Sequence, residues 1–471
     1  MKKYIVPAIM IAVTLVLAVC GRANETLLIS SNSTIIGDML SENQESPKTQ
    51  KFEADKPIYS LKNAIIVDDE NCTFTIIDIK ENGFMGVTLN VLCENKTAGE
   101  LMFVWDEVSV NGYMVHPFWA HSVAAGKKSI DEISFSNSNL KRCNITSVDE
   151  IVFTLRVYDN DDWYADNLVD DEFVVYPTGL DANSVVYPER SISASEQVII
   201  DNESCIFIIE SVETDAFRGY TINCYLENKT SDWLLFLWDD VSVNGYMVDP
   251  YWADSVAAGK KSYAEIYFVN DELERCNITS VDEIVFVLIV DDYDDRSADY
   301  LVEDEFAVYP TGLDANSVVY PKRSKTATEQ IVIDNESCIF IIESVEADAI
   351  RGYTLNCYLE NKTSDWLVFR WDDVSVNGYM LDPFWTKVVQ PGKRVFSDIR
   401  FNNSSLESIG ISEVEEIEYI LVVHNYNDWT VSSVVNEAFT YVLEIPEPVP
   451  NSFDSVHALD HFLLAEKEDI S

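Results

Sequence analysis

The chain has 471 residues, of which 81 are acidic and 32 basic, so its formal net charge is −49. A field this negative repels nucleic acid and anionic lipid surfaces and favours cations and basic partners, so we expect no nucleic-acid partner. With 47% hydrophobic residues, the chain still has enough apolar material for folded cores.

Residues 1–20 carry the pattern of an export signal. Lys2 and Lys3 precede an uncharged apolar run from Ile5 to Val19, and small residues or a cysteine follow it. No later stretch approaches the ~20 apolar residues of a membrane span. We therefore expect an exported chain whose remainder does not cross a membrane.

The end of this signal leaves two kinds of processing open. Residues 17–20 resemble a bacterial lipobox, in which Cys20 would be lipidated and become the mature N-terminus, although Val19 stands where such motifs have a smaller residue. Ordinary cleavage after Ala23 is the alternative. The expected location is accordingly either lipid-anchored at the cell membrane and facing outward, or secreted, with membrane contact only through the anchor.

One segment occurs three times at a fixed spacing. Asn111, Asn244 and Asn377 each open the string Asn-Gly-Tyr-Met, and 244 − 111 = 377 − 244 = 133. A fixed period indicates tandem copies of one folding unit. The expected organisation is a signal peptide at 1–20, a flexible linker at 21–63, repeats at 64–177, 197–310 and 330–445, linkers at 178–196 and 311–329, and an acidic tail at 446–471.

Each copy reads as a series of short strands. In the first, apolar residues alternate with polar ones around 72–76, 87–94, 101–105, 133–135, 151–157 and 173–175. Asn111-Gly112 is typical of a type I′ hairpin turn, and 124–128 predicts another turn. The one expected helical turn lies near 147–150. This pattern predicts an all-β fold of three tandem immunoglobulin-like antiparallel β-sandwich domains.

A resemblance supports that fold. The strings Gly-Tyr-Thr-Leu-Asn-Cys-Tyr-Leu-Glu-Asn-Lys-Thr at 352–363, Val-Ser-Val-Asn-Gly-Tyr at 374–379 and Pro-Gly-Lys at 391–393 resemble telokin-like immunoglobulin-like domains of exported bacterial proteins. The resemblance covers all three repeats. It implies a fold and an extracellular location of the kind found in lipoproteins and surface proteins, and it brings no catalytic residues.

The cysteines leave two alternatives open. Cys143 and Cys276 match Ile409, which indicates a buried apolar site. Bridges between Cys205 and Cys224 and between Cys338 and Cys357 are allowed in an oxidising compartment. Free buried thiols are the alternative, because in the first repeat the second cysteine is displaced by two residues to Cys93.

No residue pattern predicts an enzyme or a resident cofactor. None of the five histidines recurs between repeats, and no nucleophile motif, phosphate loop or dinucleotide motif is present. Calcium remains a weak hypothesis, because carboxylates two apart in a loop can share a hard cation. The residues concerned are Asp159, Asp161, Asp166, Asp292, Asp294 and Asp299, and a solvated acidic loop is the alternative.

Aromatic residues offer the clearest candidate binding site. Trp119, Trp252 and Trp385 follow the hairpin in each repeat, and either bind a ligand or fill the end of the core. Trp233 and Trp366 align with Glu100, so we expect them to point outward. Exposed aromatic rings on a rigid sandwich stack on sugars or anchor a protein partner.

These observations predict a non-enzymatic cell-surface protein that binds an extracellular glycan or protein through its repeats, with three copies providing avidity. A structural spacer without a ligand of its own is the first alternative. A calcium-stabilised adhesion module is the second.

Overall fold

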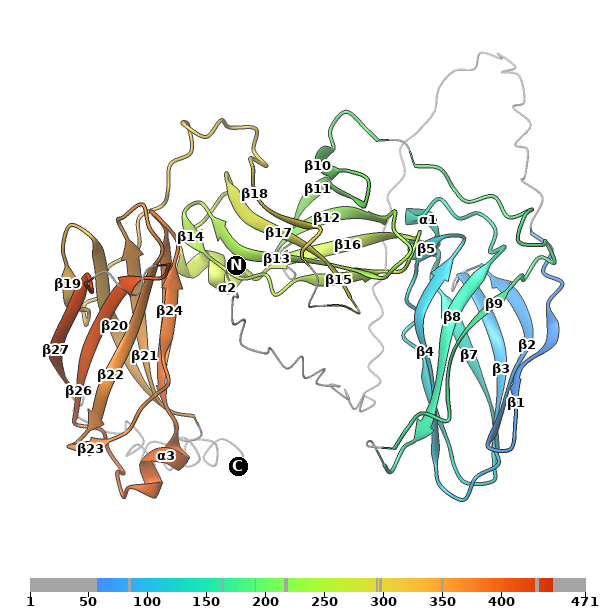
Figure 1. The fold of residues 1–471 in the computed structure, drawn as a ribbon, viewed down its shortest axis with the longest axis horizontal. Coiled ribbons are helices and arrows are strands. Elements are labelled where there is room, and N and C mark those ends of the chain that lie inside the picture. The colour runs from blue at the N-terminus through green and yellow to red at the C-terminus, as the bar shows by residue number, and fades with distance from the viewer. Residues whose placement is uncertain are drawn as a thin grey trace, which may run out of the picture. The chain divides into compact units, whose positions relative to one another are not determined.

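The computed structural model describes residues 57–443, apart from 84–85, 163–164, 191, 216–218, 294, 296–298, 349–350 and 428–431. The expected signal peptide, Cys20 and acidic tail lie outside these residues. The described residues form three copies of one immunoglobulin-like β-sandwich, which confirms the predicted fold class (Figure 1).

Every repeat has nine strands and one short helix in the same order. The first repeat comprises β1 (Lys62–Asp68), β2 (Cys72–Asn82), β3 (Gly86–Asn95), β4 (Leu101–Val110), β5 (Tyr113–Met114), β6 (Ala120–Val123), β7 (Lys128–Phe135), α1 (Asn137–Arg142), β8 (Ile151–Asp159) and β9 (Val169–Val175). The second comprises β10 (Gln197–Asp201), β11 (Cys205–Asp215), β12 (Gly219–Asn228), β13 (Leu234–Val243), β14 (Tyr246–Met247), β15 (Ala253–Val256), β16 (Lys261–Phe268), α2 (Asn270–Arg275), β17 (Ile284–Asp292) and β18 (Val302–Val308). The third comprises β19 (Gln330–Asp334), β20 (Cys338–Asp348), β21 (Gly352–Asn361), β22 (Leu367–Val376), β23 (Tyr379–Met380), β24 (Thr386–Val389), β25 (Arg394–Phe401), α3 (Asn403–Ser408), β26 (Glu416–Asn425) and β27 (Val435–Val442).

Two antiparallel sheets face each other in each repeat. In the first repeat one sheet has the order β1-β2-β3-β7, and the other runs β5-β4-β8-β9 with β6 also paired to β4. Because successive side chains of a strand point to opposite faces, alternate apolar residues of both sheets meet between them.

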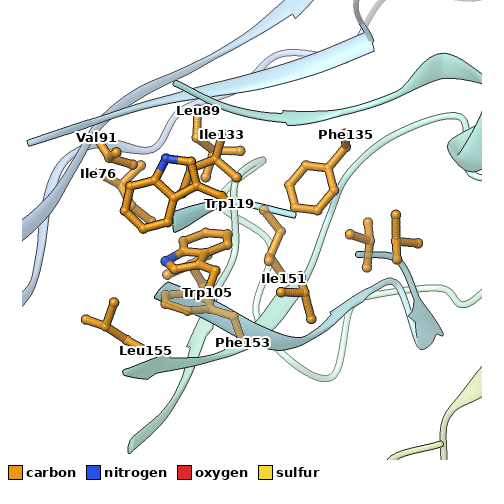
Figure 2. Close-up of a cluster of buried hydrophobic side chains, with 14 of the residues drawn as sticks. Ile76, Leu89, Val91, Trp105, Trp119, Ile133, Phe135, Ile151, Phe153 and Leu155 are labelled. Carbon is orange, nitrogen blue, oxygen red and sulfur yellow. The ribbon is translucent and has the colours of Figure 1, made fainter. Parts of the chain in front are cut away.

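The core between the sheets is rich in aromatic rings. Trp105 stacks on Phe153 with ring centroids 3.8 Å apart (Figure 2). Phe74 also lies against Phe103. The equivalent pair in the second repeat, Trp238 and Phe286, keeps the same spacing of 3.8 Å. Each repeat thus has its own hydrophobic core, which is consistent with three folding units.

The predicted hairpin turn is confirmed in all three repeats. Asn111 has φ of 46° and Gly112 has φ of 81°, the left-handed values that a type I′ turn requires at both central residues. The turn is held by its asparagine, whose Oδ1 accepts hydrogen bonds from the backbone amides of Asp149 and Glu150 at 2.9 and 3.0 Å.

The predicted helical turn near 147–150 is wrong. The helix lies earlier, at α1, where the Ser136 hydroxyl accepts a hydrogen bond from the Asn139 amide and Leu140 is buried in the core. Six residues give too few turns for a helical period to be visible in sequence, so the cap and the buried leucine decide the position.

The hairpin tips of the first and second repeats each contact the repeat that follows. The Lys261 amide donates to the Gly112 carbonyl at 3.0 Å, and the Arg394 amide donates to the Gly245 carbonyl at the same distance. Through these contacts β5 pairs with β16, and β14 with β25, in parallel. We call these two contact regions the first and second junctions.

Charged residues reinforce both junctions in the same way. Arg142, the last residue of α1, donates to the Glu265 carboxylate at 3.2 Å, and Arg275 of α2 donates to Asp398 at 3.3 Å. The linkers also contribute, because the Tyr187 hydroxyl donates to Glu150 at 2.9 Å. The Tyr320 hydroxyl makes the equivalent bond to Glu283, so each predicted linker contacts the repeat that precedes it.

Candidate ligand-binding loops

A five-residue loop between the hairpin and the next strand recurs in every repeat. It spans 115–119, 248–252 and 381–385, and each copy reads apolar, polar, Pro, aromatic, Trp. In the first repeat the Val115 amide donates to the Val108 carbonyl at 2.9 Å, and the Trp105 amide donates to the Trp119 carbonyl at 3.2 Å. Both ends of the loop are thus tied to β4.

The tryptophan of the loop belongs to the core. Trp119 is buried, with ring centroids 5.9 Å from Phe74 and 6.4 Å from Trp105, and Figure 2 shows its indole among the core side chains. Its Nε1 donates to Asp131 Oδ2 at 2.9 Å. Such burial leaves the ring no open face for a ligand, so the structure favours the core alternative for this residue.

In the other repeats Trp385 is buried as well, and Trp252 is partly buried against the core. Trp252 packs 5.9 Å from Phe207, and Trp385 packs 5.7 Å from Phe340. Of the two alternatives that the sequence left open for these tryptophans, the structure favours the core, because large aromatic rings fill the interior where they bury the most area. Ligand binding by these residues stays a prediction.

The aromatic residue immediately before each tryptophan is turned out to solvent. Phe118 is 94% exposed, Tyr251 87% and Phe384 90%. Their φ angles are 48°, 46° and 52°, in the left-handed region that bulky side chains rarely adopt. The buried tryptophan therefore acts as an anchor, and the left-handed residue before it projects its ring away from the sandwich.

In the second and third repeats a local hydrogen bond fixes the backbone of the exposed aromatic residue. The Tyr251 amide donates to Asp249 Oδ1 at 2.8 Å, and the Phe384 amide donates to Asp382 Oδ1 at 2.7 Å. In the first repeat His116 stands at the position of these aspartates, with its ring centroid 6.2 Å from that of Phe118. The tip thus combines an exposed ring with a polar neighbour.

An exposed aromatic ring beside a polar group suits recognition of a sugar or of an apolar side chain on a protein. A non-glycine residue with positive φ costs about 1–3 kcal/mol and persists only where the surrounding structure holds it. The exposed aromatic residue recurs in all three repeats, with the same positive φ and nearly full exposure. It is therefore the leading candidate for a functional residue.

Trp233 and Trp366 are half-buried, and each lies beside an aromatic residue of its own repeat. Trp233 is 6.4 Å from Tyr293 and Trp366 is 6.5 Å from Tyr426, measured between ring centroids. Glu100 occupies this position in the first repeat, where it accepts a hydrogen bond from Asn160. These two tryptophans therefore offer a site that only two repeats share.

The eight described cysteines are buried and free. In the register of the paired strands, Cys205 lies opposite Asn228 and Cys224 lies opposite Ile209, so the two sulfurs are offset along the strands. Cys338 and Cys357 show the same offset. Burial raises the pKa of Cys205 and of Cys338 to about 11, which favours the thiol form. The bridges stay a prediction, and this geometry favours free thiols.

The acidic loop after β8 uses its carboxylates within the chain. Asp159 Oδ1 accepts a hydrogen bond from the Asp161 amide at 2.9 Å, and Asp166 is exposed. In the second repeat Asp292 is half-buried and Asp299 exposed, while Asp294 lies outside the described residues. Among the described residues no group of three or more His, Cys, Asp or Glu is arranged to hold a metal ion. Calcium binding stays a prediction.

One polar cluster has the order of a catalytic triad. His121 Nε2 lies 2.8 Å from Ser129 Oγ, and its Nδ1 lies 3.1 Å from Asp131 Oδ2. Ser129, however, stands within the regular ladder of β7 opposite Cys93, where successive amides point to alternate sides and do not converge on a developing oxyanion. The cluster links β6 to β7 and fixes the carboxylate that holds Trp119.

The sequence analysis considered only the tryptophan of each loop, as a ligand-binding or a core residue, and did not consider the aromatic residue before it. The residue pair is visible in the sequence, but only the backbone conformation shows which ring is anchored and which is displayed. Repetition does not distinguish the two rings, since both positions keep the 133-residue spacing and stay aromatic in all three repeats.

No protein-family model matches the chain, and no curated protein matches it in sequence. Among solved structures, the chain is similar to the Salmonella enterica SafA pilin in complex with the SafB chaperone (Type I), at 10% identity and a TM-score of 0.14. The match covers 52% of this chain and 98% of that one. A likeness this distant carries no functional argument, so any functional conclusion must come from the residues of this chain. Within the described residues, no helix is long and apolar enough to cross a membrane.

Proposed function

We propose that this protein is exported, displayed at the cell surface, and binds an extracellular glycan or protein through the loops that carry Phe118, Tyr251 and Phe384. The recurrence of an exposed aromatic ring in a left-handed conformation carries the proposal. Stability alone does not account for such a residue, because glycine would occupy the position at lower cost.

Export and anchoring are supported by the sequence of residues 1–20, with Cys20 as the proposed lipid attachment site. The relation to telokin-like domains of bacterial surface proteins belongs to the same proposal. A Cys20→Ser variant would move the protein from the membrane fraction to the soluble fraction if the anchor is a lipid. An unchanged distribution would overturn lipidation and leave the binding proposal intact.

The test of binding is a screen of the full chain against immobilised glycans and envelope polymers, with and without calcium. The decisive variant is Phe118→Ala combined with Tyr251→Ala and Phe384→Ala. Its matched control is Ile65→Ala combined with Val198→Ala and Ile331→Ala, which removes exposed apolar side chains that also recur in each repeat. We expect the aromatic variant alone to lose binding, and equal retention by both variants would reject the site.

A structural spacer is the second candidate. The observation that favours it is the pair of equivalent junctions, which fix neighbouring repeats through backbone, aromatic and charged contacts. A spacer needs no ligand, so wild-type chain that binds nothing in the screen would favour this alternative.

A further inference from the structure

The last repeat carries the surface that the first two use to hold their successors, and no element of the described residues covers this surface. Tyr113 is 1% exposed and Tyr246 0%, because the next repeat covers each of them, whereas Tyr379 at the same position is 56% exposed. The neighbouring Met380 is also exposed, although Met114 is buried in the core cluster of the second repeat. A large apolar pair is thus presented to solvent at one end of the array of repeats.

The first repeat carries the complementary surface, which is uncovered as well. Ile130 stands where the second and third repeats have Tyr263 and Phe396, the residues that stack on Tyr113 and Tyr246. It is 66% exposed, and Lys127 and Lys128 beside it are exposed too. An apolar residue on an accessible strand with flanking lysines therefore faces solvent at the other end.

The charges at the two uncovered surfaces match. At the first junction Lys260 Nζ lies 3.6 Å from Glu150 Oε1, and at the second Lys393 Nζ lies 3.7 Å from Glu283 Oε2. The residues at these positions in the uncovered surfaces are Lys127 in the first repeat and Glu416 in the third. Both are exposed, so each surface offers one member of an ion pair that the internal junctions form twice.

We propose that the third repeat of one molecule docks on the first repeat of a second copy of this chain, reproducing the internal junction. In this contact the Gly378 carbonyl accepts from the Lys128 amide, Tyr379 packs on Ile130, and Glu416 pairs with Lys127. The two surfaces differ, so the contact is head-to-tail and leaves one free surface at each end for further copies.

The contact is weaker than the internal junctions, for two reasons. Ser408 replaces the arginine that ends α1 and α2 and reaches across each internal junction. The covalent linker that joins neighbouring repeats of one chain is also absent between separate molecules. Assembly is accordingly reversible and depends on concentration, and it increases where many copies are held on one surface.

The test is sedimentation velocity of the purified full chain over a concentration series. We expect the weight-average mass to rise with concentration, without a limit at the dimer. Lys127→Glu and Glu416→Lys should each weaken association at least tenfold, because each places like charges opposite one another. The double variant, which restores opposite charges in reversed order, should regain most of the association.

Lys62→Glu is the matched control, because it makes the same charge change on β1, at the opposite edge of the sheet from β7. It should associate as the wild type does. A chain that stays monomeric throughout the series would overturn the proposal. So would association that all four variants share equally, since another surface would then be responsible. Protection of Tyr379 from chemical modification in a monomer would show that another segment of the same chain covers this surface. That result would also overturn the proposal. None of these outcomes depends on an external ligand, so the proposal is tested separately from ligand binding.

Discussion

Tyr113 of the first repeat stacks on Tyr263 of the second, with ring centroids 5.8 Å apart and ring planes inclined by 4°. Tyr246 stacks on Phe396 at the next junction with centroids 5.9 Å apart and the same inclination of 4°. Two junctions that are separated by 133 residues in sequence therefore share one geometry. The repeats are joined by a specific interface as well as by their linkers.

The contribution of the interface tyrosine to stability can be measured by comparing Tyr246, which is buried, with Tyr379, which is exposed at the same position of the third repeat. Tyr246→Ala should lower the free energy of unfolding by about 3 kcal/mol, because a fully buried aromatic side chain is removed and a cavity remains. Tyr379→Ala makes the same change at an exposed position, and should alter stability by less than about 0.5 kcal/mol. Urea denaturation of the two variants measures the difference. Equal effects would mean that the junction contributes no stability.

The hairpin glycines provide a second comparison. A Cβ added to Gly245 would lie 2.5 Å from Cδ2 of Tyr320, whereas one added to Gly378 has no atom within 4 Å. Both residues have positive φ, so each alanine variant carries a backbone cost of about 1–2 kcal/mol. Gly245→Ala should lose about 1–3 kcal/mol more, because Tyr320 must move. Thermal unfolding tests this, and similar losses in both variants would contradict the packing of the linker on the hairpin.

Phe384, the exposed aromatic residue of the third repeat, should lower the stability of the fold. Phe384→Gly should raise the free energy of unfolding by about 1 kcal/mol, because glycine accepts φ of 52° without strain and little buried area is lost. Phe384→Ala keeps the strain and should change stability little. If the glycine variant is less stable than the wild type, the ring has a structural role that its exposure does not reveal.

One carboxylate at the second junction makes stability depend on pH. Burial raises the pKa of Asp240 to about 7, with Asp239 and Glu305 adding to the effect, and its backbone carbonyl accepts a hydrogen bond from Gln390 of the third repeat. Between the ordinary aspartate pKa of 3.8 and about 7, folded Asp240 keeps a proton that the unfolded chain has released. The stability that protonated Asp240 contributes is therefore fully present below pH 3.8, and it is lost as the pH rises through about 7.

Asp240→Asn should flatten this dependence. The control is Asp373→Asn, which changes the exposed residue at the same position of the third repeat and should retain the wild-type slope between about pH 4 and pH 7, the window set by these values. Unfolding curves at several pH values measure both slopes. An unchanged slope in Asp240→Asn would show that other groups cause the dependence.

The Ser129–His121–Asp131 cluster should not act as a nucleophilic site. Its serine lies in a regular strand, without amides that converge to stabilise an oxyanion. A fluorophosphonate probe should leave Ser129 unlabelled, as judged by mass spectrometry of the full chain. Labelling that is lost in His121→Ala would contradict this and revive the enzyme hypothesis.

The parts of the fold that depend on local chemistry could be predicted from the sequence. Asn111-Gly112 specifies its own turn, and alternation of polar and apolar residues specifies the strands and their inward faces. The helix at α1 could not be predicted, because a buried Leu140 and a serine cap position it and neither creates a period. The thiols of Cys143 and Cys276 are buried, in agreement with the isoleucine at the third position.

The candidate site was harder to predict for a different reason. The sequence shows Phe118 and Trp119 side by side, and it leaves open whether Trp119 binds a ligand or fills the core. Their opposite orientations follow from the left-handed backbone at Phe118, which has no signal in the side chain itself. The junction contacts link residues far apart in the chain, such as Tyr113 with Tyr263, so only the comparison of covered and uncovered copies reveals them.

The most direct test of the proposed function is a stepwise removal of the three exposed rings. Retention of the full chain on an immobilised glycan or envelope polymer would be measured for the wild type, for each single alanine variant at 118, 251 and 384, and for the combined variant. Multivalent binding predicts that each loss multiplies the dissociation rate and that the combined variant is not retained. If no ligand in the panel retains the wild type, or if all variants are retained equally, the exposed rings are not a binding site.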